Sequence, residues 1–150
     1  MGQPPSNPQI PSLPRRLGAL LYDAVLLLGL LMLAILLLIV PYDLLAARPY
    51  PHGDPLYRSL LQAYLVAVIG AFYVYFWTHG GQTLGMRTWR LRVLRDDGGP
   101  LSLADAVRRF AWAVLSLAPA GLGLWWCLLD REGLAWHDRR SRTRPILLPR

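Results

Sequence analysis

The sequence predicts an all-α membrane protein with two full transmembrane helices, a third helical segment broken by proline and glycine, and a short cytoplasmic β-like pairing. Three observations predict this class. Of the 150 residues, 54% are hydrophobic and only 17% are charged, whereas a typical soluble domain has about 25% charged residues. Long apolar runs alternate with polar segments along the chain. The 16 basic residues, all arginine, concentrate in a few of those polar segments.

The first apolar run is the longest and predicts the first span. Residues 1–14 are interpreted as a proline-rich flexible arm, and residues 15–148 as a single membrane domain. The run at residues 17–40 holds one charged side chain, Asp23. It exceeds both the about 20 residues that a transmembrane helix needs and the about 7–15 apolar residues of a signal peptide. The proline-rich residues 41–58 are predicted to form a loop.

The second and third apolar runs differ in character. Residues 59–77 carry no charge and end in aromatic side chains, which are typical of the membrane–water boundary. Residues 110–129 contain Pro119 and Gly121 near their middle, and both are unfavourable inside a helix. Since about 20 apolar residues can also cross a membrane, two interpretations stay open for this run: a third span, or a broken helix that enters and returns on one side.

The polar segment after the second run begins with glycines. Residues 80–87 match a phosphate-binding loop superficially, but that loop ends in Gly-Lys-Ser/Thr, and here Met86 stands in place of the lysine. We therefore expect a cytoplasmic turn rather than a nucleotide site. Gly81, Thr83 and Gly85 are its candidate functional residues.

Two short strands and a helix start are predicted around this turn. Residues 90–95 alternate polar and apolar side chains, which predicts a strand, and residues 96–100 predict a tight turn after it. Ser102 stands three residues before Asp105 and predicts the start of a helix. Residues 143–148 predict a second strand. If the two strands pair, both lie on one side of the membrane.

No motif in the chain predicts an enzyme, a metal site or a cofactor. The three histidines, His52, His79 and His137, lie in different loops and lack the i, i+4 spacing of a helical zinc pair. Cys127 is the sole cysteine, which excludes an internal disulfide and a multi-cysteine zinc site.

The arginines predict the orientation of the chain. The loop at residues 41–58 holds only Arg48 and Arg58, whereas the N-terminal end, residues 78–109 and the tail from residue 130 hold the rest. Cytoplasmic segments are enriched in basic residues, so we expect both termini of a multi-pass membrane protein in the cytoplasm. On a membrane protein, this positive charge favours anionic lipid head groups, at about 1 kcal/mol per residue, over nucleic acid.

Asp23 is the candidate functional residue inside a span. It lies seven residues after Arg16, about 10 Å along a helix, where a charge costs about 2.5–3.5 kcal/mol. Two interpretations stay open: a buried ion pair that fixes packing, or a site for a proton or cation. Helical side chains lean toward the N-terminus, so Arg16 points away from Asp23. We expect Asp23 to form a buried ionic cluster with Arg109, and Asp138 to neutralise Arg16.

Four short blocks follow one another along the chain. They are residues 16–19 leading to Asp23, residues 81–87 leading to residues 91–93, residues 101–102 followed by Arg109, and residues 134–138, which include His137, followed by Thr143. In these blocks the chain resembles the RDD family of small bacterial membrane proteins. The resemblance implies that Arg16, Asp23 and Asp138 are the arginine and the two aspartates of the family name, and it suggests membrane transport.

Two function classes are compatible with these residues. In the first, the protein is a transporter or a transporter subunit that exchanges a proton or monovalent cation at Asp23. In the second, it is a non-catalytic membrane scaffold or accessory protein whose arginine-rich cytoplasmic face binds a partner or anionic lipid. Two or three spans are too few for a pore, so transport would require a homo-oligomer or a membrane-protein partner.

Overall fold

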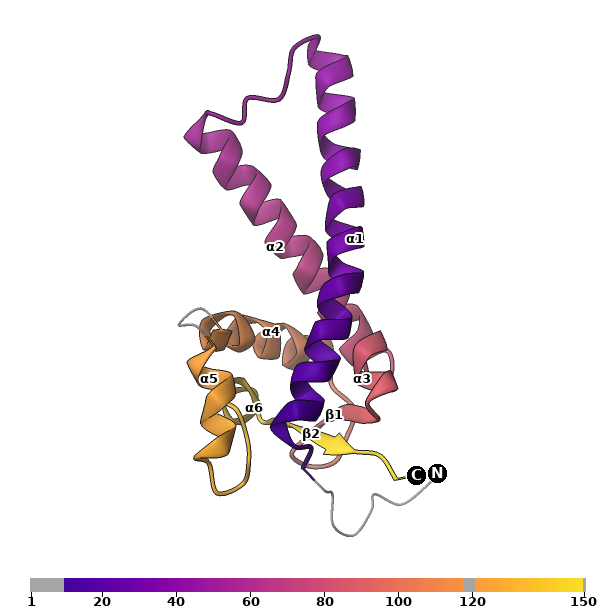
Figure 1. Ribbon diagram of the computed structural model, residues 1–150, viewed down its shortest axis with the longest axis vertical. Coiled ribbons are helices and arrows are strands. Elements are labelled where there is room, and N and C mark those ends of the chain that lie inside the picture. The colour runs from indigo at the N-terminus through magenta and orange to yellow at the C-terminus, as the bar shows by residue number, and fades with distance from the viewer. Residues whose placement is uncertain (1–9, 118–120, 150) are drawn as a thin grey trace. The chain divides into compact units, whose positions relative to one another are not determined.

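The computed structural model describes residues 10–117 and 121–149, which form six α-helices, one 3₁₀ helix and two strands (Figure 1). In chain order the elements are α1 (Leu13–Ala46), α2 (Pro55–Thr78), α3 (Leu84–Thr88), β1 (Leu91–Arg95), α4 (Leu103–Leu117), α5 (Leu122–Trp125), the 3₁₀ helix η1 (Trp126–Leu128), α6 (Trp136–Ser141) and β2 (Thr143–Leu147). The chain divides into two compact units, named here unit 1 (Met1–Asp23 with Tyr73–Arg150) and unit 2 (Ala24–Phe72).

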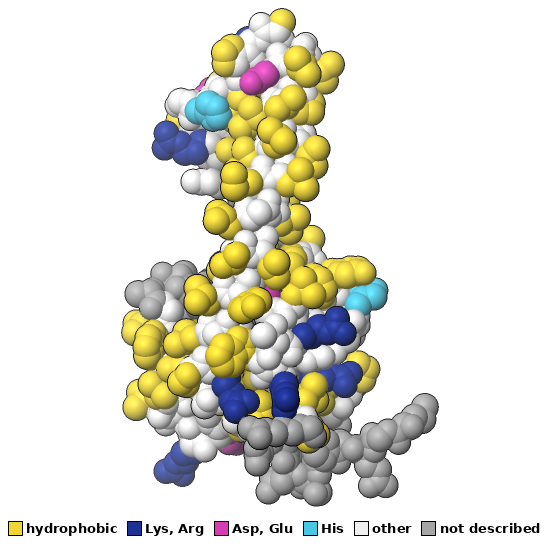
Figure 2. All heavy atoms as spheres, turned by 45° about the vertical axis from the view of Figure 1, so that its right-hand side comes forward, with side chains coloured by type: hydrophobic (Ala, Val, Ile, Leu, Met, Phe, Trp, Pro, Cys, Tyr) yellow, Lys and Arg dark blue, Asp and Glu magenta, His cyan; other side chains and the backbone are white. Residues whose placement is uncertain are grey.

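Unit 2 contains most of α1 and α2 and the connection between them. Within the described residues, α1 and α2 are the two helices long and apolar enough to cross a membrane, in agreement with the spans predicted at residues 17–40 and 59–77. Many of their large apolar side chains are exposed, as a lipid-facing surface requires, and Figure 2 shows such side chains along this unit. The Tyr64 hydroxyl donates to the carbonyl of Ala34 at 3.3 Å and joins the two helices.

Both helices extend beyond the predicted runs, so the loop predicted at residues 41–58 is wrong at both ends and shortens to residues 47–54. Pro41 lies inside α1, where proline removes one backbone hydrogen bond, but the helix continues for another turn. The start of α2 is fixed by Asp54, whose carboxylate accepts a backbone N–H of the first turn at 2.8 Å. Pro55 follows, and proline is favoured at the first helical position.

The two strands of unit 1 lie side by side and pair antiparallel, with Leu91 opposite Leu147 (Figure 1). This confirms the pairing predicted for residues 90–95 and 143–148. The side chains of Leu91 and Val93 are fully buried, as the period-two alternation of a half-buried strand requires. The small sheet therefore joins the segment before α4 to the segment after α6.

The third apolar run, predicted at residues 110–129, does not form one helix. α4 already begins at Leu103, where Ser102 and Asp105 cap it reciprocally: the Asp105 N–H donates to Ser102 Oγ at 3.2 Å, and the Ser102 N–H donates to Asp105 Oδ2 at 3.1 Å. This is the predicted helix start. Pro119 lies outside the described residues. Gly121 has a φ of +75°, a conformation that favours glycine, and it precedes the short helices α5 and η1.

Several large apolar side chains of α4 are exposed, while its buried face carries two charged side chains beside the core residue Ala106. Asp105 and Arg109 are buried on the side that packs against α6, whereas Leu103, Val107 and Val114 are exposed. A helix on a water-soluble domain buries its apolar stripe. The reversed arrangement of α4 is typical of a helix whose outer face contacts something apolar.

Candidate functional site

A buried ionic cluster lies at the centre of unit 1, and Asp138 on α6 is its only carboxylate among the described residues. Arg16 Nη1, from the start of α1, lies 3.0 Å from Asp138 Oδ2, and Arg109 Nη2, from α4, lies 2.7 Å from Asp138 Oδ1. All three side chains are almost fully buried. The Arg16 contact is a charge-assisted hydrogen bond, a strong class of interaction in proteins. The Arg109 contact is an ion pair.

Local structure holds the carboxylate and Arg16 in place. Asp138 occupies the first turn of α6, where its Oδ2 accepts the backbone N–H of Ala135 at 3.0 Å. Arg16 donates from Nε to the carbonyl of Pro11 at 3.2 Å and from Nη2 to the carbonyl of Gly133 at 2.8 Å. Each of its three nitrogen atoms is thus bonded to a protein oxygen. The segment before α1 and the loop before α6 are joined through this one side chain.

Arg109 extends the cluster toward β2 and α2. Its Nη1 donates to Thr143 Oγ1 at 2.6 Å, and that hydroxyl lies 2.7 Å from Ser141 Oγ. Its guanidinium carbon lies 5.1 Å from the centre of the Trp77 ring. Two guanidinium groups share one carboxylate, so the cluster retains one net positive charge, and the electron-rich face of Trp77 offsets part of it.

The charges in the cluster shift the pKa values of both titratable residues on α6. Burial alone raises the pKa of Asp138, but the positive charges of Arg109 and Arg16 outweigh it and lower the pKa to about 2. Burial lowers the pKa of the neighbouring His137 to about 4, against the opposing effect of the Asp138 charge. Near pH 7, Asp138 is therefore ionised and His137 is neutral.

Asp23 forms a separate site in unit 1. It is 1% exposed, and it accepts the Thr83 hydroxyl at 2.5 Å through Oδ2 and the Gly85 N–H at 2.9 Å through Oδ1. Thr83 also caps α3 by accepting the N–H of Met86 at 3.2 Å. A Cβ at Gly85 would collide with the carbonyl of Ala19 and lie 2.9 Å from Asp23 Oδ1. Glycine is therefore required where α3 meets Asp23.

The structure places the residues of the predicted turn in two locations. Thr83 and Gly85 hold the carboxylate of Asp23. Gly81, with a φ of +74°, accepts the N–H of Val93 at 2.7 Å and thereby joins the turn to β1. The glycine-rich segment thus connects the Asp23 carboxylate to the small sheet.

The predicted pair of Asp23 with Arg109 is not formed. Within the described residues Asp23 takes part in no salt bridge, because Arg109 is bonded to Asp138 and Thr143 instead. Arg16 and Asp138 do lie together, in the pairing that the sequence predicted. The sequence reasoning missed Trp77, because aromatic residues at a span end are typical of the membrane boundary and give no indication of a cation partner.

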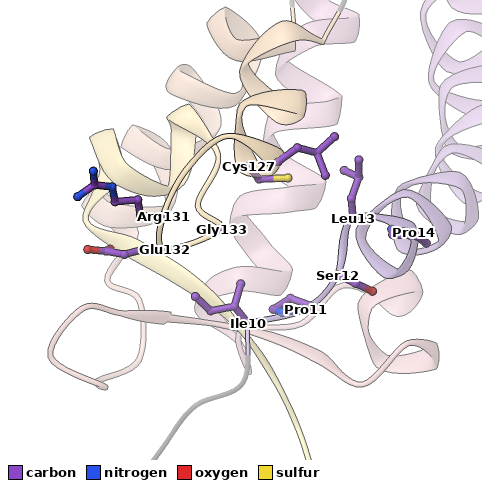
Figure 3. Close-up of a pocket in the computed structure, with 10 residues that line it drawn as sticks. Ile10, Pro11, Ser12, Leu13, Pro14, Cys127, Arg131, Glu132 and Gly133 are labelled. Carbon is purple, nitrogen blue, oxygen red and sulfur yellow. The ribbon is translucent and has the colours of Figure 1, made fainter.

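An open pocket of about 550 Å³ lies next to Arg16. Figure 3 shows Leu13 and Pro14 on one side of it and Cys127 above, with the side chains of Arg131 and Glu132 pointing away from Leu13. The carbonyls of two other lining residues, at positions 11 and 133, are already bonded to Arg16. The Arg16 guanidinium therefore stabilises the wall of the pocket through its hydrogen bonds to these two carbonyls.

Both sites lie almost entirely within a stretch of the chain that matches one family model. A comparison with protein-family models finds the RDD family over residues 10–142. The chain belongs to the RDD family. The matched region contains Arg16, Asp23, Arg109 and Asp138, whereas Thr143, which binds Arg109, follows it. No curated protein and no solved structure matches the chain.

The cluster predicts strong coupling between Asp138 and Arg109. Asp138→Asn should lower the free energy of unfolding by about 3–5 kcal/mol, since it leaves two buried guanidinium groups without a carboxylate. Arg109→Gln should cost less, because Asp138 keeps Arg16 as its partner. The double variant should lose less than the sum. The matched pair of Asp23→Asn with Arg109→Gln should be additive within about 0.5 kcal/mol. Unfolding in mixed detergent micelles measures both cycles, and additivity of the first pair would contradict the assignment.

The lowered pKa of His137 predicts a loss of stability in mild acid. Between pH 6.5 and 4 the unfolded chain binds a proton at His137 that the folded chain does not, so the free energy of unfolding should fall as the pH falls through this range. The loss should reach at most about 3 kcal/mol, at about 1.4 kcal/mol per pKa unit. His137→Gln should make the free energy of unfolding depend less on pH over this range. His79→Gln, which changes an exposed histidine, is the control and should leave this pH dependence unchanged.

Proposed function

We propose that this RDD-family protein is a membrane transport protein, or a subunit of one, that exchanges a proton or a monovalent cation at Asp23. The observation that carries the proposal is the environment of Asp23. This carboxylate is buried on α1, a helix apolar enough to span a membrane, and it has no salt-bridge partner among the described residues.

The cost of burying a charge supports a role for a mobile cation. An ionised carboxylate removed from water is expensive unless a positive charge compensates it. Thr83 and Gly85 supply neutral donors, while the buried guanidinium groups of Arg16 and Arg109 are bound to Asp138. Proton uptake or the binding of a cation would supply the missing charge, and carboxylate and hydroxyl oxygens are ligands that hard cations prefer. Ionisable residues inside membrane spans mark ion pathways by default.

The proposal includes the absence of enzymatic activity, and the geometry at Ser116 supports it. Ser116 Oγ lies 3.3 Å from His137 Nδ1, and His137 Nε2 lies 3.5 Å from Asp138 Oδ1, in the order of a hydrolase triad. The 3.5 Å contact is too long for an orienting hydrogen bond, and a histidine with a pKa of about 4 is a weak base. Ser116 is also buried against Gly123.

We further propose that the protein resides in the bacterial inner membrane with both termini in the cytoplasm. On this proposal the chain between β1 and β2 makes no complete crossing of the membrane. The antiparallel pairing of β1 with β2 supports this, because a crossing between them would leave the two strands on opposite sides. The excess of arginines in unit 1 supports the cytoplasmic orientation. Figure 2 shows several of these side chains on the visible face.

A second function, that of a non-catalytic scaffold or accessory protein, is favoured by the exposed arginines of unit 1. Several of them form no salt bridge among the described residues: Arg15, Arg87, Arg90, Arg131 and Arg142. Such a surface would bind an acidic partner or anionic lipid. The same surface would suit assembly with a membrane-protein partner, and a chain with two spans needs either such a partner or a homo-oligomer to enclose an ion path.

The topology predicts the outcome of C-terminal reporter fusions. A green fluorescent protein fused after residue 150 should fluoresce, and alkaline phosphatase at the same position should be inactive, because the tail stays in the cytoplasm. Fusions at residue 52, in the connection between α1 and α2, are the control and should give the opposite pair of results. An active phosphatase at residue 150 would require a complete crossing between β1 and β2.

Transport at Asp23 predicts a loss of flux in one variant. The purified protein is reconstituted in liposomes that hold a pH-sensitive dye, and gradients of sodium, potassium or lithium are applied. The wild-type protein should couple a cation gradient to a pH change, and Asp23→Asn should abolish it without loss of folded protein. Asp97→Asn, an exposed acid in the turn after β1, is the matched control and should retain flux. Flux retained by Asp23→Asn would make Asp23 structural, and no flux in the wild type would favour the scaffold function.

A further inference from the structure

A hollow between α4 and α6 lies apart from the two carboxylate sites. It has a volume of about 280 Å³ and is lined by Trp112, Leu115, Ser116, Trp136 and Arg140. We propose that α4 lies along the membrane–water interface and that this hollow binds the head group of an anionic phospholipid through Arg140. The proposal is independent of transport at Asp23.

The outer face of α4 supplies the first argument. Leu103, Val107 and Val114 are 66%, 51% and 44% exposed and lie on the side opposite the buried Asp105 and Arg109. These positions follow the spacing of one helical face. Exposed to water, this face would lose the free energy that apolar burial supplies. A helix with one apolar face outward and charged residues on the other face lies in the interfacial region of a bilayer.

Tryptophans next to α4 also indicate that this part of unit 1 lies at the level of the lipid head groups. Trp125, Trp126 and Trp136 are 50%, 41% and 41% exposed, although tryptophan side chains are usually well buried in a soluble domain. Their rings combine an apolar body with one N–H donor, and such rings gather at the level of the lipid head groups. The outer face of α4 and these tryptophans are therefore both expected at the boundary of the bilayer.

Arg140 makes the hollow suited to an anion. Its guanidinium carbon lies 5.3 Å from the centre of the Trp112 ring, and it forms no salt bridge within the described residues. The neighbouring Arg139, in contrast, is bonded to Asp130 at 2.7 Å. A planar guanidinium binds a phosphate through two parallel hydrogen bonds. Arg140 is thus available for a phosphate, held by stacking on an aromatic ring.

The remaining lining selects a lipid over a soluble phosphate. Leu115 and the two tryptophan rings form apolar walls beside Arg140, and Leu115 is 59% exposed, next to the outer face of α4. A lipid can place its phosphate on Arg140 and its glycerol and first acyl carbons against these walls. A free phosphate would leave the walls in water, so an amphiphilic ligand fits the hollow better.

The test uses the full-length protein in phosphatidylcholine nanodiscs with increasing fractions of phosphatidylglycerol. Binding is read from the rise in unfolding temperature and from lipid adducts in native mass spectrometry. Arg140→Gln should weaken phosphatidylglycerol binding about tenfold, as the loss of a charge-assisted contact predicts. Arg140→Lys should keep part of the affinity. Arg95→Gln is the matched control: it removes a partly exposed arginine of the same unit that lies outside the hollow and is already paired with Asp97, and it should leave the affinity unchanged.

Three results would overturn the proposal. Equal binding by Arg140→Gln and the wild type would exclude Arg140, and equal losses in Arg140→Gln and Arg95→Gln would indicate diffuse attraction without a site. Glycerol 3-phosphate that raises the unfolding temperature as much as the lipid would indicate a soluble ligand.

A second measurement tests the depth of α4 in the bilayer, in a Cys127→Ser background. A spin label at Val107→Cys should be accessible to oxygen and protected from a water-soluble nickel complex, with the reverse for a label at Ser102→Cys; water exposure of the Val107 label would remove α4 from the interface.

Discussion

The carboxylate of Asp138, shared by two guanidinium groups, is the interaction on which unit 1 depends. Through it the start of α1, the middle of α4 and the first turn of α6 meet at one point, and Arg109 carries the connection on to β2 through Thr143. Buried charges are stable only when paired and hydrogen-bonded. None of these elements can therefore move away without leaving a charge unpaired, which explains why a helix as apolar on its outside as α4 keeps a polar inner face.

Asp23 and Asp138 are both buried aspartates of unit 1, but their environments differ in kind. Asp138 is compensated by fixed positive charges, and its pKa of about 2 keeps it ionised at any physiological pH. Asp23 is held by a hydroxyl and a backbone N–H, which orient the carboxylate but bring no charge. The first arrangement suits a permanent structural role. The second is the arrangement on which the proposed transport function rests, because it supplies no fixed positive charge to the carboxylate.

Much of the fold followed from local sequence patterns, because apolar runs, the Ser102 cap and the alternation in β1 are each contained in a short window. The limits of the helices did not. Asp54 followed by Pro55 is a local start signal for α2 inside the expected loop, whereas α1 continues through Pro41 against the local preference of proline. The partner of Arg109 could not be predicted from local sequence patterns either. Asp138 lies outside the apolar runs, whereas Asp23 is the one acidic residue within the first of them, so the sequence favoured Asp23 as the partner. The fold of α6 instead brings Asp138 Oδ1 to 2.7 Å from Arg109 Nη2.

The distance along the chain between Arg16 and Asp138, 122 residues, has a consequence for biosynthesis. The ribosome adds Arg16 and Arg109 to the chain before the aspartate with which both pair. Until α6 emerges, the growing chain carries two guanidinium groups without their counter-ion, and these stay hydrated because burying them unpaired is too costly. Contacts this distant in sequence form late. The ordering of unit 1 is therefore delayed until Asp138 has been synthesised, and insertion of the two apolar helices precedes it.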